Sequence, residues 1–175
     1  MTGSHSKKFI FFHLYKVAGC SLVNAIAPFA DFRSEHPHTK PSEVLADAEG
    51  KKLFDDYYTF AFVRNPWDWQ VSLYEFMRGD DSHFQHATII KQTFDEYIEG
   101  RVNEDLKTQY EFLSDKGDTT SPISLDFVGR LENINNDFGK FLSNEVKNNI
   151  IKSKFNGISI DFEAEKLIFP DSYSE

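Results

Sequence analysis

Two short segments of this 175-residue chain combine cationic, glycine and hydroxyl residues in the manner of phosphate-binding loops. The first segment, residues 13–22, reads HLYKVAGCSL and contains Lys16, Gly19 and Ser21. A loop of this kind can direct backbone N–H groups, an ammonium group and a hydroxyl at a phosphate, assisted by the dipole of the following helix. The Walker A pattern G-x-x-x-x-G-K-[ST] is absent. Taken alone, the segment is equally compatible with a tight turn whose lysine is solvated.

The second segment, residues 60–74, reads FAFVRNPWDWQVSLY. Arg64 follows an apolar run, and Ser72 lies two helical turns further along the chain. An arginine fork together with a hydroxyl suits a phosphate monoester. Without the first segment a simpler interpretation would be favoured, in which Arg64 forms a structural ion pair and Ser72 is an ordinary helix residue.

The hydrophobic pattern around both segments predicts strands that alternate with helices. Such alternation indicates an α/β domain with a mainly parallel central sheet, in which ligands bind at the carboxyl ends of the strands. Both segments follow an expected strand and precede an expected helix, so they should lie at the same edge of the sheet. The expected strands are 8–13, 58–63 and 125–128, with a weaker pattern at 158–162; the expected helices are 21–27, 41–54, 66–79 and 134–142; the expected loops are 31–40 and 116–122.

The helix expected after residue 65 carries the clearest start signals. Asn65 is a good N-cap residue, and Pro66 suits the first helical position. Trp67, Val71 and Tyr74 are spaced i, i+4 and i+7, which is typical of an apolar stripe. This spacing predicts that Trp67 belongs to the core.

The composition limits the classes of protein to which the chain can belong. Its length suits one domain, residues 1–175, and its net charge of −9 disfavours a nucleic-acid binder. No apolar stretch reaches the roughly 18 residues of a membrane helix, and the first residues lack the shape of a signal peptide. The single cysteine, Cys20, favours a reducing compartment, so we expect a cytoplasmic protein. The sequence shows no metal-ligand spacing and predicts no particular oligomeric state.

Together, the two segments resemble motifs of the sulfotransferases that use 3′-phosphoadenosine-5′-phosphosulfate (PAPS), in the branch of carbohydrate and bacterial sulfotransferases. The first family motif is H-x-P-K-T-[AG]-G-T-S, from which the chain departs at Tyr15, Val17 and Cys20. The second is F-V-R-[ND]-P-[YW]-[DE]-R-x-V-S-x-Y, from which it departs at Trp69. Residues 126–133, DFVGRLEN, resemble a third motif, D-F-V-G-R-[FL]-E-N-L. The resemblance covers about residues 9–142 and fades beyond residue 144.

The resemblance implies a P-loop-like three-layer α/β fold and assigns roles to the residues that match its motifs. Lys16 and the segment Ala18, Gly19, Cys20 and Ser21 would hold the 5′-phosphosulfate of PAPS. Arg64 and Ser72 would hold the 3′-phosphate, and Arg130 would either close over the nucleotide or pair with an acid such as Glu132. The missing hydroxyls at Val17 and Cys20 predict weaker donor binding than in the family, and no metal is required.

The acceptor hydroxyl needs a general base, for which the pair His36 and His38 is the leading candidate. A similar H-x-H pair occurs in the uronyl O-sulfotransferases, where the second histidine is the base, so we expect His38 to act with His36 assisting. The alternative, that both histidines are simply solvated in a polar loop and have no catalytic role, is equally compatible with the sequence. His13 is a weaker candidate, because it should order the phosphate loop, and Glu35 and Glu75 are carboxylate alternatives.

Three functions are compatible with these patterns. The first is sulfuryl transfer from PAPS to a hydroxyl group. The favoured acceptor is a carbohydrate that is neutral or weakly charged. The second is a non-catalytic module that binds PAPS or its product 3′-phosphoadenosine-5′-phosphate (PAP). The third, a P-loop-like kinase, is the weakest because the Walker A pattern is missing.

Overall fold

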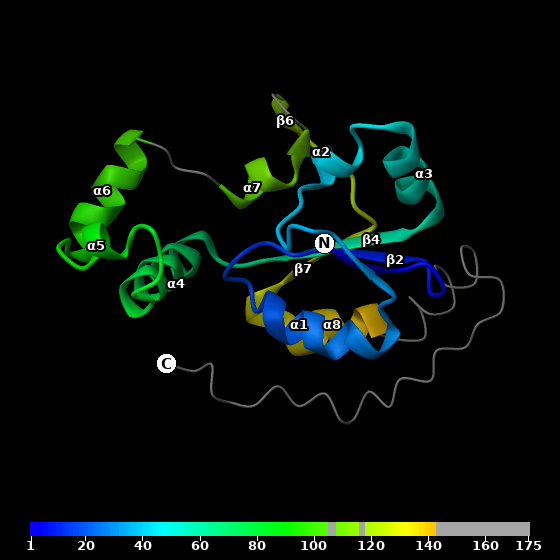
Figure 1. Ribbon diagram of the computed structural model, residues 1–175, viewed down its shortest axis with the longest axis horizontal. Coiled ribbons are helices and arrows are strands. Elements are labelled where there is room, and N and C mark those ends of the chain that lie inside the picture. Colours follow the sequence, from blue (N-terminus) through cyan, green and yellow to red (C-terminus); the bar gives the residue numbers. More distant parts are fainter. Residues whose placement is uncertain (105–107, 116–117, 143–175) are drawn as a thin grey trace.

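The computed structural model describes residues 1–104, 108–115 and 118–142. These residues form an α/β arrangement around a five-stranded sheet with the strand order β3-β1-β2-β4-β7. Helices lie on both sides of the sheet, with α1 and α8 on one side and α2, α3 and α7 on the other (Figure 1). The predicted α/β class is therefore confirmed.

One half of the sheet, from its middle strand to one edge, consists of three parallel strands. Strand β2 (Phe9–Phe12) pairs with β4 (Tyr58–Val63), and β4 pairs with β7 (Phe127–Arg130). The strands predicted at 8–13 and 58–63 are confirmed, and the third lies two residues further along the chain than expected. Because the three strands are parallel, the segments that follow β2 and β4 leave the sheet at the same edge.

Two short antiparallel strands that the sequence pattern did not predict extend the sheet. Strand β1 (Thr2–Ser4) pairs with both β2 and β3 (Phe32–Arg33), antiparallel in each case. The expected loop 31–40 thus contains a strand at its start. The sheet is therefore mixed: β2, β4 and β7 are parallel, and β1 and β3 complete it with antiparallel pairs.

Aromatic side chains fill the space between the sheet and the helices. On one face, Phe11 contacts Phe60 at a ring-centroid distance of 5.0 Å, and Phe62 lies 6.3 Å from Phe138 of α8 (Ile134–Leu142). On the other face, the Phe12 ring lies 5.5 Å from that of Phe54 in α3 (Ala48–Asp56). Burial of such large apolar rings is the main source of stability for the sheet.

The remaining helices differ from the sequence prediction at two places. The helix expected at 41–54 is broken into α2 (Pro41–Val44) and α3, and Asp47 caps α3 by accepting a hydrogen bond from Gly50 N. The predicted loop 116–122 contains a strand, β6 (Asp118–Pro122), which pairs with β5 (Ser114–Asp115), and the weak pattern at 158–162 lies outside the described residues. The other helices are α1 (Gly19–Ile26), α4 (Pro66–Gly79), α5 (His86–Ile89), α6 (Phe94–Glu104) and α7 (Gln109–Phe112), with 3-10 turns at Ala27–Phe29 and Leu131–Asn133.

Helices α4, α5 and α6 gather around a second, smaller apolar cluster. Its buried members are Tyr74, Met77, Ile89 and Tyr97. The Tyr97 hydroxyl donates a hydrogen bond to Gln70 Oε1 at 2.9 Å, which ties α6 to α4. Within the described ranges, none of the helices has both the length and the apolar character needed to cross a membrane.

Candidate functional site

The loop between β2 and α1 adopts a conformation that few residues tolerate. Lys16 and Ala18 both have positive φ angles, 60° and 55°, in the left-handed region. At Gly19 a Cβ atom would lie only 1.7 Å from Nε2 of His13, so the imidazole ring occupies the space that any larger residue would need. This packing fits the ordering role that we expect for His13 and explains the glycine.

The N-terminus of α1 is not capped by a side chain. Ala18 occupies the N-cap position, and the first turn of the helix contains no acidic residue. By contrast, Asn65 caps α4 by accepting a hydrogen bond from Trp67 N at 3.0 Å. The positive end of the α1 dipole therefore meets no carboxylate of its own first turn, an arrangement that favours an anion.

Lys16 and Arg64 follow the paired parallel strands β2 and β4, and the charge of Arg64 acts on Lys16. Burial lowers the pKa of Lys16, the charge of Arg64 lowers it further, and Cys20 partly opposes this decrease. The ammonium Nζ sits 4.2 Å from the centre of the Phe76 ring, a cation–π contact with α4. Two neighbouring cations repel each other, and a bound anion would relieve that repulsion.

The backbone at Arg64 is held by a side chain that the sequence prediction missed. Gln109 of α7 accepts a hydrogen bond from Arg64 N at 2.8 Å and donates one to Arg64 O at 2.7 Å. The Gln109 side chain is buried. The residue that follows Arg64, Asn65, donates its backbone N–H to the carboxylate of Glu132. The start of α4 is thus fixed from α7 and from the turn after β7.

Trp69 joins α4 to the loop between β2 and α1, which is called the first loop from here on. Its indole Nε1 donates a hydrogen bond to the carbonyl oxygen of Tyr15 at 2.8 Å, and the two rings lie 5.2 Å apart. The prediction that Trp67 is in the core was wrong, because Trp67 is 74% exposed whereas Trp69 is 2% exposed. The face of α4 that packs inward is set by the contact with Tyr15. Tyr15 and Trp69 are both positions where the chain departs from the family motifs, and they contact each other.

Ser72 is half-buried on the same face of α4. Trp69, Ser72 and Phe76 are spaced i, i+3 and i+7, which places them along one side of a helix. Because Trp69 contacts Tyr15 and Phe76 contacts Lys16, this side of α4 faces the first loop. Lys16 and Arg64 thus follow the carboxyl ends of β2 and β4, and Ser72 lies on the side of α4 that faces the loop of Lys16.

His38 packs against the first loop, whereas His36 does not make the same contacts. The His38 ring lies 4.6 Å from the His13 ring and 5.8 Å from the Tyr15 ring, and its Nδ1 is 2.8 Å from the carbonyl oxygen of His13. Both His36 and His38 are exposed. His36 contributes its carbonyl oxygen, which accepts hydrogen bonds from the hydroxyls of Ser34 and Thr39.

The other residues named from the sequence have mainly local contacts. Glu35 is exposed, and Glu75 is 3.8 Å from Arg78 in an exposed ion pair. The Val17 side chain is fully buried, so this position serves the core, and Cys20 is exposed. Arg130 is exposed at the end of β7, and its backbone N–H donates to Asp137 at 2.9 Å.

The glycine and the aspartate of the third motif have structural roles. A Cβ at Gly129 would lie 2.4 Å from the Phe62 ring, which crosses the strand at this point. Asp126 accepts hydrogen bonds from Thr59 N at 2.7 Å and from the Thr59 hydroxyl at 3.0 Å. These contacts fasten β7 to β4, with Asp126 acting at the start of β4 and Gly129 near its end.

Comparison with known proteins leaves the family of the chain open. No protein-family model and no solved structure matches it. It is 28% identical over 102 residues to an uncharacterized protein of Archaeoglobus fulgidus, a match that covers 58% of this chain and 78% of the relative. A cluster of three or more His, Cys, Asp or Glu side chains able to hold a metal is absent from the part of the chain that the structure describes.

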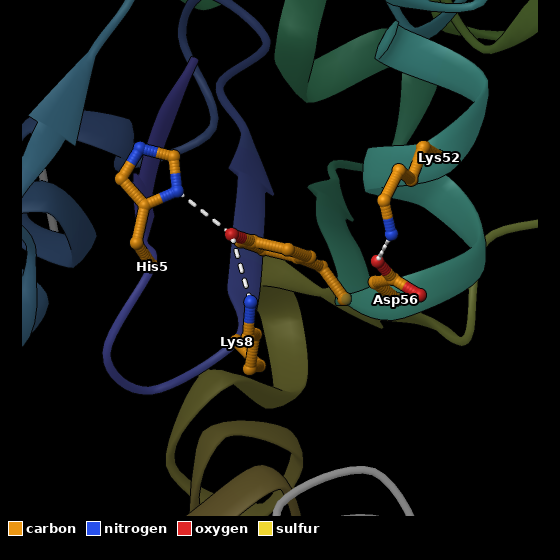
Figure 2. A network of polar contacts seen from close by, with 5 residues as sticks. His5, Lys8, Lys52 and Asp56 are labelled. Carbon is orange, nitrogen blue, oxygen red and sulfur yellow. Dashed lines mark hydrogen bonds and ion pairs between the residues drawn. The ribbon is translucent and has the colours of Figure 1, made fainter. Parts of the chain in front are cut away.

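A second polar cluster lies at the amino ends of β2 and β4, opposite the candidate site. Figure 2 shows His5 and Lys8 directed at one hydroxyl oxygen, which belongs to Tyr57, with contacts of 2.7 and 3.2 Å. His5 also stacks on Phe32 with ring centroids 4.4 Å apart. These contacts fasten the β1–β2 hairpin to β3 and to the start of β4, so we assign the cluster a structural role. The nearby Lys52–Asp56 ion pair is exposed and spans one turn of α3.

Proposed function

We propose that this chain is a sulfotransferase that moves a sulfuryl group from PAPS to a hydroxyl acceptor, with a carbohydrate as the favoured acceptor. The observation that carries the proposal is that the segments of Lys16 and Arg64 follow the paired parallel strands β2 and β4 and are joined by the hydrogen bond from Trp69 to Tyr15. The motif resemblance assigns these two cations to the two phosphate ends of one nucleotide. The proposal includes a P-loop-like form of the α/β fold and, from the single cysteine, a cytoplasmic location.

The residues at this edge of the sheet fit a nucleotide that carries anionic groups at both its 3′ and its 5′ position. Lys16 and the uncapped start of α1 supply a cation and the positive end of a helix dipole for the 5′-phosphosulfate. Arg64 supplies a planar fork for the 3′-phosphate, with the Ser72 hydroxyl on the facing side of α4. Because the net charge of −9 repels anions at long range, these local groups must provide the attraction.

In the proposed reaction, the acceptor hydroxyl loses its proton to His38 as its oxygen bonds to sulfur. The bond between sulfur and the bridging phosphate oxygen breaks, and its electron pair stays on the 5′-phosphate of PAP. Lys16 stabilises the charge that develops on that phosphate. Transfer of this kind depends mainly on positioning and on charge stabilisation, by analogy with phosphoryl transfer.

The hydrogen bond of His38 supports its role as the base. A carbonyl oxygen can only accept, so Nδ1 of His38 must donate to the oxygen of His13. In a neutral imidazole the other nitrogen, Nε2, then carries the lone pair and can accept a proton. Burial, with smaller contributions from His38 and the N-terminus, lowers the pKa of His13 to about 4, so His13 is neutral at pH 7.

Nucleotide binding tests the donor site. PAP should raise the melting temperature more than AMP, which lacks the 3′-phosphate, because Arg64 and Ser72 would be unoccupied by AMP. A ligand at about 100 times its Kd adds roughly 2.7 kcal/mol to the free energy of unfolding. Equal shifts with both nucleotides would remove the assignment of Arg64 and Ser72, and a shift with ATP alone would favour a kinase.

Turnover tests the chemistry. With PAPS and a panel of hydroxyl acceptors, Lys16→Ala should abolish turnover while PAP binding is largely retained, since the lysine acts most strongly in the transition state. His38→Ala should lower kcat by roughly 10²- to 10⁴-fold, and His36→Ala, an exposed histidine two residues away, is its matched control with a much smaller effect. PAP binding without turnover on any acceptor would favour the non-catalytic module.

A further inference from the structure

A row of aromatic rings leads away from Lys16 along the end of α4. The Lys16 ammonium lies over Phe76, whose ring centre is 5.7 Å from that of His83 in an edge-on contact. His83 in turn stacks on Phe84 with ring centres 4.6 Å apart and an angle of 29° between the ring planes. The three rings contact one another in sequence and are here called the aromatic row, which begins at the proposed reaction centre.

The outer end of the aromatic row is open to solvent. Phe84 is 87% exposed and Phe76 is 42% exposed. A Phe ring held with most of its surface in water gives up the hydrophobic free energy that burial would supply. Packing within the described residues therefore does not account for Phe84, and a ligand that covers its face would recover this energy.

The turn that carries the aromatic row is held by its own hydrogen bonds. The Asp80 carboxylate accepts from the backbone N–H and the hydroxyl of Ser82, and these bonds lower the pKa of Asp80. The backbone N–H of His83 donates to Asp80 O at 3.0 Å, and Gln85 N donates to His83 Nδ1 at 3.2 Å. A ring presented by a preformed turn loses little conformational entropy when a ligand stacks on it.

We propose that the aromatic row is the acceptor subsite and that it binds an uncharged saccharide, one sugar ring of which stacks on the exposed face of Phe84. This inference rests on the proposed sulfotransferase function, because Lys16 is what makes the row lead to a reaction centre.

Exposure and charge select this ligand. A sugar ring that stacks one apolar face on an exposed aromatic ring keeps its hydroxyls hydrated, whereas a phenol or a lipid needs an enclosing apolar pocket. Lys16 lies at the inner end of the row, next to the proposed donor site, whereas along the rest of the row the carboxylates Glu75, Asp80 and Asp81 outnumber Arg78, which disfavours a sulfated or uronate-rich chain there. An uncharged saccharide stacked on the outer ring extends inward along the row, which brings a hydroxyl toward Lys16.

Direct binding tests the subsite without relying on catalysis. The probes are two uncharged disaccharides, cellobiose and N,N′-diacetylchitobiose, titrated into the full chain in the presence of PAP and followed by NMR. Phe84→Ala should weaken their binding by roughly threefold to tenfold, and Phe84→Tyr, which keeps a ring, should restore it. Val102→Ala is the matched control, since it truncates a side chain that is 63% exposed on α6, away from the row. None of these substitutions should change the affinity for PAP.

The possible outcomes separate this inference from the proposed function. Equal disaccharide binding by the wild type and Phe84→Ala would overturn the subsite, as would no disaccharide binding by a protein that binds PAP. Tighter binding of a sulfated disaccharide than of the neutral ones would overturn the choice of ligand. Saccharide binding that depends on Phe84 in a protein that does not bind PAP would support saccharide binding by the aromatic row but refute the sulfotransferase, and with it the role of the row as an acceptor subsite.

Discussion

Gln109 gives the sharpest test of how the candidate site is built. Its buried amide group both accepts from Arg64 N and donates to Arg64 O, at 2.8 and 2.7 Å. Gln109→Ala leaves both backbone groups without these partners, at a cost of about 1–3 kcal/mol for each buried group that stays unsatisfied. We expect a total loss of about 2–6 kcal/mol in the free energy of unfolding, or a decrease in melting temperature of roughly 4–24 °C.

The same substitution should also affect ligand binding, because Arg64 loses the contact that fixes its backbone. The affinity for PAP should fall by about tenfold, which corresponds to about 1.4 kcal/mol. Gln109→Glu is the matched variant: it keeps an acceptor for Arg64 N but loses the donor to Arg64 O, so its effect on stability should be intermediate. Urea unfolding and calorimetric titration with PAP measure both effects. If Gln109→Ala has the stability and PAP affinity of the wild type, the role assigned to Gln109 is refuted.

Three further predictions concern the first loop and the third motif. Gly19→Ala should destabilise the protein by roughly 1–3 kcal/mol in urea unfolding and weaken PAP binding, since its Cβ would collide with His13; an unchanged midpoint would contradict this packing. Because the pKa of His13 is lowered to about 4 from an ordinary value of 6.5, the unfolded chain binds the extra proton first. The stability that neutral His13 contributes is therefore fully present above pH 6.5. As the pH falls from 6.5 toward 4, the free energy of unfolding should decrease by about 1–2 kcal/mol after allowance for solvent screening. The free energies measured by urea unfolding of the wild type and of His13→Gln should diverge over this range. Asp126→Ala should lower the stability by about 1–2 kcal/mol through loss of the Thr59 contacts, with PAP affinity unchanged in titration, and a large loss of affinity would instead give Asp126 a role in binding.

The parts of the fold predicted from sequence are those that depend on local patterns. The apolar runs of β2 and β4 and the Asn65–Pro66 start of α4 each contain their own signal within a few residues. Strands β1 and β3 lack such a signal, because their pairing depends on partners far away in sequence, such as Thr2 with Arg33. The break between α2 and α3 depends on one side-chain cap, from Asp47, inside a pattern that otherwise favours a continuous helix.

The candidate site divides in the same way. Lys16 belongs to one recognisable segment, and Arg64 and Ser72 belong to another. The rule that parallel strands end at a common edge of the sheet predicts that these two segments meet. Gln109 and Phe76 could not be identified, because neither lies in a motif and each acts through a contact across the fold. The wrong prediction that Trp67 rather than Trp69 is buried has the same cause. Helical spacing indicates that α4 has an apolar stripe, but which face of the helix is buried depends on a contact across the fold, from Trp69 to Tyr15.

Helix α4 belongs to two packing units at once. Trp69 is a member of the main core, whereas Tyr74 and Met77 belong to the small cluster with α5 and α6, and Leu73 packs against both. Small clusters with few buried side chains open at lower free energy than a central sheet, so amide protons of α4–α6 should exchange with solvent as a cooperative unit before those of β2 and β4. Each such opening would carry Ser72 and Phe76 away from Lys16 while the sheet stays intact. Entry and exit of a nucleotide could then proceed at the rate of this local unfolding, without any hinge between domains.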